Sequence, residues 1–366
     1  MQGLSPSGVI KPEVREQTAY TLKHFKADVK LDQNENPYEL PDSLKREVVE
    51  RVLARPWGRY PEFVPAATTA ALARFTGWSA EGILVGNGSN ELIQASLAVT
   101  LGPGRTVAIP QPTFTLYKLM SKTLQARIVE VPLKSSDFTF DVPKLVEAAR
   151  SADVTVICSP NNPTGTLLEQ GALVEVLKNA KGLVLLDEAY HEFSGQSAFP
   201  LLATHPNLVV LRTFSKAMSM AGLRFGYMMA HPEIAREVHK AKLPYNVNIF
   251  TLAAAELVIE RQHLLAAAIQ TLIQERDRVM DELRRRPLVT AFNSSANYIL
   301  MRTAQPARAI FDALYAQGVL VRDVSSYPML DRALRVSIGM PDENDKFLAA
   351  LDRALEQTLD QALETK

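Results

Sequence analysis

The sequence predicts an α/β fold, in which a large domain with a mostly parallel central sheet flanked by helices is joined to a smaller α+β domain. Between residues 83 and 230, short apolar runs alternate with amphipathic stretches. Several of these runs are apolar throughout, as strands buried on both faces are. Helical patterns dominate residues 251–286, and strands mix with helices after Pro287. Strands separated by helices of this length indicate a parallel sheet with helices on both faces.

The large domain, expected at residues 42–286, contains apolar strands with helices between them. Strands are predicted at residues 83–85, 107–109, 154–157, 183–186, 208–211 and 225–229, with a helix at 90–101. Pro110 and Pro112 should end the second strand, because proline has no N–H to donate to a strand ladder.

The smaller domain, expected at residues 287–366, mixes the two patterns. Strands are predicted at residues 298–300, 319–321 and 334–338, with a helix around 307–317 and a closing helix. Residues 1–41 should pack against this domain or against a partner subunit.

Composition narrows the possible functions. The 366 residues carry a formal net charge of zero and no basic stripe, so neither nucleic acid nor an anionic membrane is expected as a partner. The single cysteine, Cys158, excludes an intramolecular disulfide and a multi-cysteine metal site. No secretory signal or membrane-spanning apolar stretch is visible, which predicts a cytoplasmic protein without a bound metal.

Polar motifs follow four of the predicted strands, at residues 86–90, 161–165, 187–190 and 213–216. In open α/β sheets, ligands bind beyond the carboxyl ends of the strands. The four motifs are therefore expected to form one site.

These motifs supply what pyridoxal phosphate (PLP) needs from a protein: an amine, a carboxylate for the ring nitrogen, and donors for the phenolic oxygen. Lys216 is expected to form the Schiff base and to move protons between the substrate Cα and the cofactor C4′. Asp187 should hold the pyridinium nitrogen, while Tyr190 and Asn162 donate to the phenolic oxygen. Taken alone, Asp187 could be a helix cap or part of a structural ion pair, and residues 162–165 could be a turn. The combination favours PLP.

The cofactor phosphate needs backbone N–H groups at a helix start, together with cations or hydroxyls. The expected phosphate ligands are a loop that opens a helix and three side chains near the lysine: Gly88, Ser89 and Asn90, with Thr213, Ser215 and Arg224. A dinucleotide site is disfavoured, because Glu91 occupies the place of the third glycine of that fingerprint. Phe114 could stack on the pyridine ring or pack in the core.

From residues 31–37 to residues 334–339, the chain resembles the class I and II aminotransferases of PLP fold type I. The resemblance is greatest to the histidinol-phosphate aminotransferase subfamily, whose most characteristic parts here are Asn-Glu-Asn-Pro at residues 34–37 and Arg-Tyr-Pro at residues 59–61. Two residues depart from the family pattern. Asn90 stands where aspartate is common, and Phe114 where tyrosine is common; neither change threatens the reaction class.

The resemblance implies further roles. Tyr60 would reach the phosphate of the neighbouring subunit's cofactor, which implies a homodimer with shared active sites. Arg335 would bind the substrate anion and Arg322 the substrate phosphate, with Tyr20 and Asn36 lining the substrate pocket. The implied substrates are small molecules, namely a phosphorylated amino alcohol and glutamate or 2-oxoglutarate.

Other readings of the same motifs stay open. Aromatic amino-acid aminotransferases and a threonine-phosphate decarboxylase of cobalamin synthesis share them. The aromatic enzyme would have no use for Arg322, and the decarboxylase would need no 2-oxoglutarate. A PLP-fold regulator would need a fused DNA-binding domain, for which the residues before Leu31 are too few.

Overall fold

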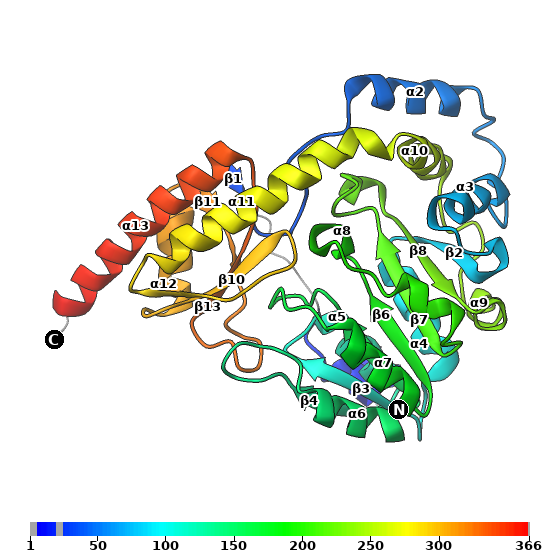
Figure 1. The fold of residues 1–366 in the computed structure, drawn as a ribbon, viewed down its shortest axis with the longest axis horizontal. Helices are drawn as coiled ribbons and strands as arrows, with labels where there is room; N and C mark the ends of the chain where they lie inside the picture. Colours follow the sequence, from blue (N-terminus) through cyan, green and yellow to red (C-terminus); the bar gives the residue numbers. More distant parts are fainter. Residues whose placement is uncertain (1–5, 20–24, 365–366) are drawn as a thin grey trace.

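A computed structural model describes residues 6–19 and 25–364, and a seven-stranded sheet forms its centre (Figure 1). In sheet order the strands are β2 (Ile83–Asn87), β8 (Phe225–Ala230), β7 (Leu208–Thr213), β6 (Leu183–Asp187), β5 (Val154–Cys158), β3 (Thr106–Gln111) and β4 (Arg127–Pro132). The last five run parallel to one another, whereas β8 is antiparallel to both β2 and β7. The predicted fold class is therefore confirmed.

Helices cover both faces of this sheet, because its strands are apolar on both sides. On β7, Leu208 and Val210 belong to one core and Val209 and Leu211 to the other. The first core also contains side chains of α2 (Asp42–Leu53), α3 (Ala66–Thr76), α6 (Val142–Ser151), α7 (Gln170–Asn179) and α10 (Ile249–Glu260). The second contains side chains of α4 (Ser89–Thr100), α5 (Thr115–Thr123) and α9 (Pro232–His239). Two short helices, α1 (Pro12–Arg15) and α8 (His191–Ser194), lie in connections.

A second, antiparallel sheet is formed toward the C-terminal end of the chain. Its order is β12 (Arg322–Asp323), β13 (Ala333–Ser337), β10 (Tyr298–Thr303) and β9 (Val289–Ala291). It shares a separate core with α11 (Ala266–Arg284), α12 (Ala307–Ala316) and α13 (Pro341–Glu364). The N-terminal strand β1 (Val29–Lys30) pairs in parallel with β11 (Val319–Leu320). The domain limits after residues 41 and 286 stay predictions.

The structure differs from the sequence-based expectation in its less apolar strands. Strands β1, β4, β9 and β12 were not predicted. Strand β4 lies at the sheet edge with half-exposed side chains, so it has no continuous apolar run. The prediction that proline ends β3 was wrong for Pro110, which lies within the strand. It is tolerated there because β3 pairs with β5 only through Val107 and Ala108, so Pro110 lies beyond that ladder.

The parallel strands all end at one edge of the central sheet, and the polar motifs follow them there. Figure 1 shows this edge facing the second sheet and the long helix α11. Among residues 6–19 and 25–364, no helix combines the length and the apolar character that crossing a membrane requires.

Candidate active site

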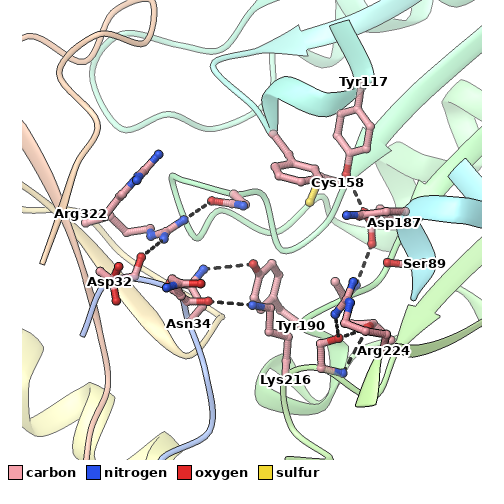
Figure 2. A pocket seen from close by; sticks show the side chains of 18 of the residues that line it. Asp32, Asn34, Ser89, Tyr117, Cys158, Asp187, Tyr190, Lys216, Arg224 and Arg322 are labelled. Carbon is pink, nitrogen blue, oxygen red and sulfur yellow. Dashed lines mark hydrogen bonds between the residues drawn. The ribbon is translucent and has the colours of Figure 1, made fainter. Parts of the chain in front are cut away.

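A pocket with a volume of about 260 Å³ lies at the carboxyl ends of the parallel strands (Figure 2). The structure brings the four polar motifs together around it, along with residues 32–34 and the second sheet. The predicted site residues that line it are Ser89, Asn90, Phe114, Asn162, Asp187, Tyr190, Thr213, Ser215, Lys216, Arg224, Arg322 and Arg335.

Lys216 lies three residues beyond the end of β7, and its amine faces this pocket. The Nζ atom donates a hydrogen bond of 2.8 Å to the carbonyl oxygen of Gln33. Burial, assisted by the positive charge of Arg335, lowers the pKa of Lys216 to about 7. A large fraction of this amine is therefore unprotonated near neutral pH, as a nucleophilic amine must be.

Asp187 is the last residue of β6, and both of its oxygens are hydrogen-bonded. Oδ2 accepts from the hydroxyl of Tyr117 at 2.6 Å, and Oδ1 accepts from the backbone N–H of Ala189 at 3.1 Å. Burial raises the pKa of Asp187 to about 6, and the hydrogen bond from Tyr117 acts in the opposite direction. Asp187 thus presents a fixed, buried carboxylate to the pocket.

Tyr190 and Asn162 each keep a donor for a ligand, because within the described residues no acceptor binds the Tyr190 hydroxyl proton or the Asn162 side-chain NH₂. The Tyr190 hydroxyl accepts a hydrogen bond of 3.0 Å from the side-chain amide of Asn34, which leaves its own proton available. The Asn162 oxygen accepts a bond of 2.7 Å from Arg335, which can only donate, so the amide nitrogen of Asn162 is the free end. Burial raises the pKa of Tyr190, so this hydroxyl stays a donor.

The first anion site is built where α4 begins. Ser89 opens this helix, and Arg224 donates to the Ser215 hydroxyl at 2.9 Å. The Thr213 hydroxyl orients Ser215, to which it donates at 3.0 Å. A helix N-terminus, hydroxyls and a guanidinium together are a donor set suited to a phosphate.

Two glycines allow this close arrangement. Gly88, the residue before the helix, has φ +75°, and a Cβ there would lie 2.6 Å from Nη2 of Arg224. A Cβ on Gly226 of β8 would lie 2.3 Å from the backbone nitrogen of Ser89. The sequence therefore keeps room for the arginine and for the exposed helix N–H groups, and the residues present fit the phosphate of PLP.

A second anion site lies across the pocket, on the second sheet. Arg322 of β12 and Arg335 of β13 are directly opposite each other in the antiparallel ladder, and both line the pocket. Like charges at such positions are unfavourable unless an anion lies between them. Arg335 also donates to the carbonyl oxygen of Asp32 at 2.6 Å, and its buried Nε has no hydrogen-bond partner among the described residues. The guanidinium of Arg322 likewise has no hydrogen-bond partner within residues 6–19 and 25–364.

Of the predicted residues in the described part of the chain, three do not line this pocket: Gly88, which directly precedes Ser89, and Tyr60 and Asn36. Tyr60 is 82% exposed, and its ring stacks on Tyr245 with a centroid distance of 4.6 Å. Asn36 lines an adjacent cavity and donates to the carbonyl oxygen of Ala217 at 3.0 Å. Tyr20 falls outside the described residues.

Seven residues that line the pocket were not predicted as site residues: Asp32, Gln33, Asn34, Tyr117, Cys158, Ala189 and Tyr327. Two of them, Asn34 and Tyr117, hydrogen-bond through their side chains to Tyr190 and Asp187 respectively. Asn34 belongs to the Asn-Glu-Asn-Pro segment, in which we singled out Asn36 instead. Tyr117 lies three residues after Phe114, and a helix starting at Thr115 places the two on one side. That spacing could have indicated that Tyr117 lies near the pocket. Its contact with Asp187 joins residues 70 positions apart, so the local sequence could not predict it.

Fold and site together define the class of protein: an aminotransferase of PLP fold type I. The family model for class I and II aminotransferases matches residues 26–351, and the chain belongs to this family. A histidinol-phosphate aminotransferase of Chlorobium phaeovibrioides is 40% identical over 346 residues, which are 93% of this chain and 96% of the relative.

Solved structures of aminotransferases are also similar to this chain. The histidinol-phosphate aminotransferase of Clostridium acetobutylicum superimposes with a TM-score of 0.84 at 25% identity, covering 90% of this chain and 99% of that one. The enzyme of the same name from Sinorhizobium meliloti, solved in complex with pyridoxal 5′-phosphate, gives a TM-score of 0.82 at 24% identity, covering 91% of this chain and 92% of that one. At that identity the second match shows the shared fold.

Proposed function

We propose that this protein is a PLP-dependent aminotransferase that converts L-histidinol phosphate and 2-oxoglutarate to imidazole acetol phosphate and L-glutamate, a step of histidine biosynthesis. The observation that carries the proposal is the presence of two separate anion sites in one pocket, with a lysine amine between them. Figure 2 shows Arg322 on one side, Ser89 and Arg224 on the other, and Lys216 and Tyr190 in the middle. The similarity to histidinol-phosphate aminotransferases supports the same assignment.

The charge of the pocket fits two anionic ligands at once. Its lining contains three arginines, Arg224, Arg322 and Arg335, together with the Lys216 amine and two carboxylates, Asp32 and Asp187. One anion would be the cofactor phosphate and the other the substrate phosphate or carboxylate.

The cofactor-binding residues have distinct proposed roles. PLP, when bound, supplies an electron sink that allows a proton to leave the carbon carrying the substrate amine. Lys216 would hold the cofactor aldehyde covalently and then carry that proton. Asp187 would hold the proton on the ring nitrogen, while Tyr190 and Asn162 would donate to the phenolic oxygen. Phe114, which lines the pocket, would cover one face of the ring.

The phosphate of PLP would be held by the first anion site. The proposed ligands are Ser89, Asn90, Ser215 and Arg224, with Gly88 and Thr213 shaping the site. Each half-reaction of a ping-pong transaminase places a different amino donor in one pocket. Arg335 can bind either the phosphate of histidinol phosphate or a carboxylate of glutamate, because a guanidinium binds both bidentately.

Arg322 provides a test of this substrate assignment. Replacing Arg322 with glutamine should raise the KM for L-histidinol phosphate about tenfold to a hundredfold, because a charge-assisted hydrogen bond contributes about 1.5–3 kcal/mol. Steady-state kinetics with L-histidinol phosphate and with phenylalanine measure the effect. The phenylalanine reaction should be nearly unchanged, because that donor carries no phosphate.

The matched control is Arg308→Gln, which removes an exposed arginine of α12 that pairs with Asp312. It should leave both reactions unchanged. An Arg322→Gln enzyme that keeps its KM for L-histidinol phosphate would remove Arg322 from substrate binding.

We also propose that the enzyme is a homodimer with shared active sites. Tyr60 is 82% and Trp57 63% exposed, and an aromatic cluster joins Tyr60, Phe63 and Tyr245. Further exposed apolar side chains lie nearby in the sequence, at Val49 and Leu53 among others. Exposed apolar groups gathered in this way mark an interaction surface, and a second copy of the chain would cover it. The formal net charge of zero supports the further proposal that the enzyme binds no nucleic acid, because it gives the chain no overall attraction for a polyanion. We propose a cytoplasmic location as well.

Tyr60→Phe tests the shared site. If the hydroxyl reaches the partner's cofactor phosphate, PLP should bind about tenfold more weakly, because one hydrogen bond to a charged group is lost. Equilibrium titration of apoenzyme with PLP, combined with sedimentation equilibrium, measures affinity and assembly together. Tyr315→Phe, on α12, should change neither. A fully active monomer would contradict the proposal.

A further inference from the structure

Tyr117 belongs to none of the sequence motifs, yet it is one of the largest fully buried side chains of the protein. It lies in the first turn of α5, directly after the loop that follows β3. Its ring packs edge-on against Phe114, with a centroid distance of 5.5 Å and an interplanar angle of 86°. Helix α5 therefore places both aromatic side chains in the pocket, and Figure 2 shows Tyr117 beside Asp187.

The Tyr117 hydroxyl makes a short bond of 2.6 Å to Oδ2 of Asp187. This length is typical of an O–H donor bound to an ionised acceptor. The backbone N–H of Ala189 holds the other oxygen at 3.1 Å. Two donors thus fix the carboxylate on both oxygens, and the remaining lone pairs are available to a ligand in the pocket.

Burial works against the charge that these donors stabilise. An ionised carboxylate in a dry site is costly, and desolvation raises the pKa of Asp187 to about 6 although the Tyr117 bond lowers it. The other titratable groups that interact electrostatically with Asp187 are Cys158, Glu188, Tyr190, Tyr298 and Lys216. The Glu188 side chain is bound to Arg212, so Tyr117 is the side chain that donates directly to Asp187 among the described residues.

We infer that Tyr117 is a positioning residue for the transamination: its hydroxyl keeps Asp187 ionised and oriented toward the cofactor ring nitrogen, and so keeps the proton on that nitrogen. The inference rests on the proposed function, because only a bound pyridine ring gives Asp187 a nitrogen to hold. Without the Tyr117 proton, the carboxylate becomes more basic and competes with the ring for the shared proton. The ring then withdraws electrons less strongly.

Tyr117→Phe removes the hydroxyl and keeps the ring that packs on Phe114. We expect kcat to fall about tenfold with little change in KM, since one charge-assisted hydrogen bond is lost. The spectroscopic pKa of the lysine-bound cofactor should rise by roughly one pH unit, because a less positive ring leaves the attached nitrogen more basic. A pH titration of the cofactor absorption in the holoenzyme measures this shift without turnover.

A cofactor analogue separates positioning from packing. In 1-deaza-pyridoxal phosphate a carbon replaces the ring nitrogen, so Asp187 has no proton to hold there. Wild type and Tyr117→Phe should therefore bind this analogue with equal affinity. Tyr227→Phe, which removes another buried tyrosine hydroxyl, on β8, should leave both the pKa and kcat unchanged.

Three results would overturn the inference. One is an unchanged cofactor pKa and kcat in Tyr117→Phe. Another is an equal loss of affinity for PLP and for the deaza analogue, which would make Tyr117 a packing residue only. The third is a wild-type protein that binds no PLP, which would overturn the proposed function as well. The first two results leave the proposed function intact.

Discussion

Replacing Lys216 with alanine should abolish multiple turnover, with a loss of at least about 10⁴-fold, because the same amine attaches the cofactor and moves the proton. Alanine provides neither function. The cofactor should still bind without a covalent bond, since the phosphate site around Ser215 and Arg224 does not involve this lysine. Assays with excess donor and acceptor measure turnover, and dialysis followed by absorption spectroscopy measures retained PLP.

Two further variants make this result specific. Lys216→Arg keeps a positive charge but has no readily deprotonated amine, so it should be as inactive as alanine. Lys144→Ala removes an exposed lysine of α6 and should be fully active. Continued turnover by Lys216→Ala at a substantial rate would show that another group attaches the cofactor.

The second large effect is expected for Asp187→Asn, with kcat falling by about 10²–10⁴. The amide is nearly the same size, and its oxygen can still accept from Tyr117 at the position of Oδ2. Its NH₂ group would then occupy the position of Oδ1, where it can accept neither from the Ala189 N–H nor from a protonated ring nitrogen. The ring nitrogen would therefore lose its proton, and the ring its electron-withdrawing charge. Single-turnover kinetics and the absorption spectrum of the bound cofactor both report this change.

Asp141→Asn is a suitable control, because asparagine can replace aspartate as the N-cap of α6. It should be active. An Asp187→Asn enzyme with normal kcat would mean that the ring nitrogen needs no carboxylate, and the assignment of Asp187 would be wrong.

Much of the fold could be predicted because its central strands have a simple signature. Residues buried on both faces of a sheet must be apolar without interruption, and Leu183–Asp187 and Leu208–Thr213 meet this condition nearly throughout. Strand β4 does not, because an edge strand has one exposed side. The pairing of β1 with β11 joins residues almost 300 positions apart. Each strand is only two residues long, so the sequence pattern could not predict this pairing.

The residues of the candidate site likewise fall into those that the sequence could predict and those that it could not. Lys216 and Asp187 could be singled out because each lies at or shortly after the end of an apolar strand, where a buried polar group must have a partner. The roles of Asn34 and Tyr117 could not be predicted, because each depends on a side-chain contact with a distant residue, Tyr190 and Asp187 respectively. The register that sets Arg322 opposite Arg335 is likewise a property of the folded sheet.

The central claim is that this chain transfers an amine from L-histidinol phosphate. The most direct test mixes purified holoenzyme with L-histidinol phosphate, phenylalanine or O-phosphothreonine in single-turnover experiments, following the absorption of the lysine-bound cofactor. We predict a fast loss of that absorption with L-histidinol phosphate alone, restored by 2-oxoglutarate. A faster response to phenylalanine would contradict the claim and indicate an aromatic amino-acid aminotransferase, and carbon dioxide released from O-phosphothreonine would indicate a decarboxylase.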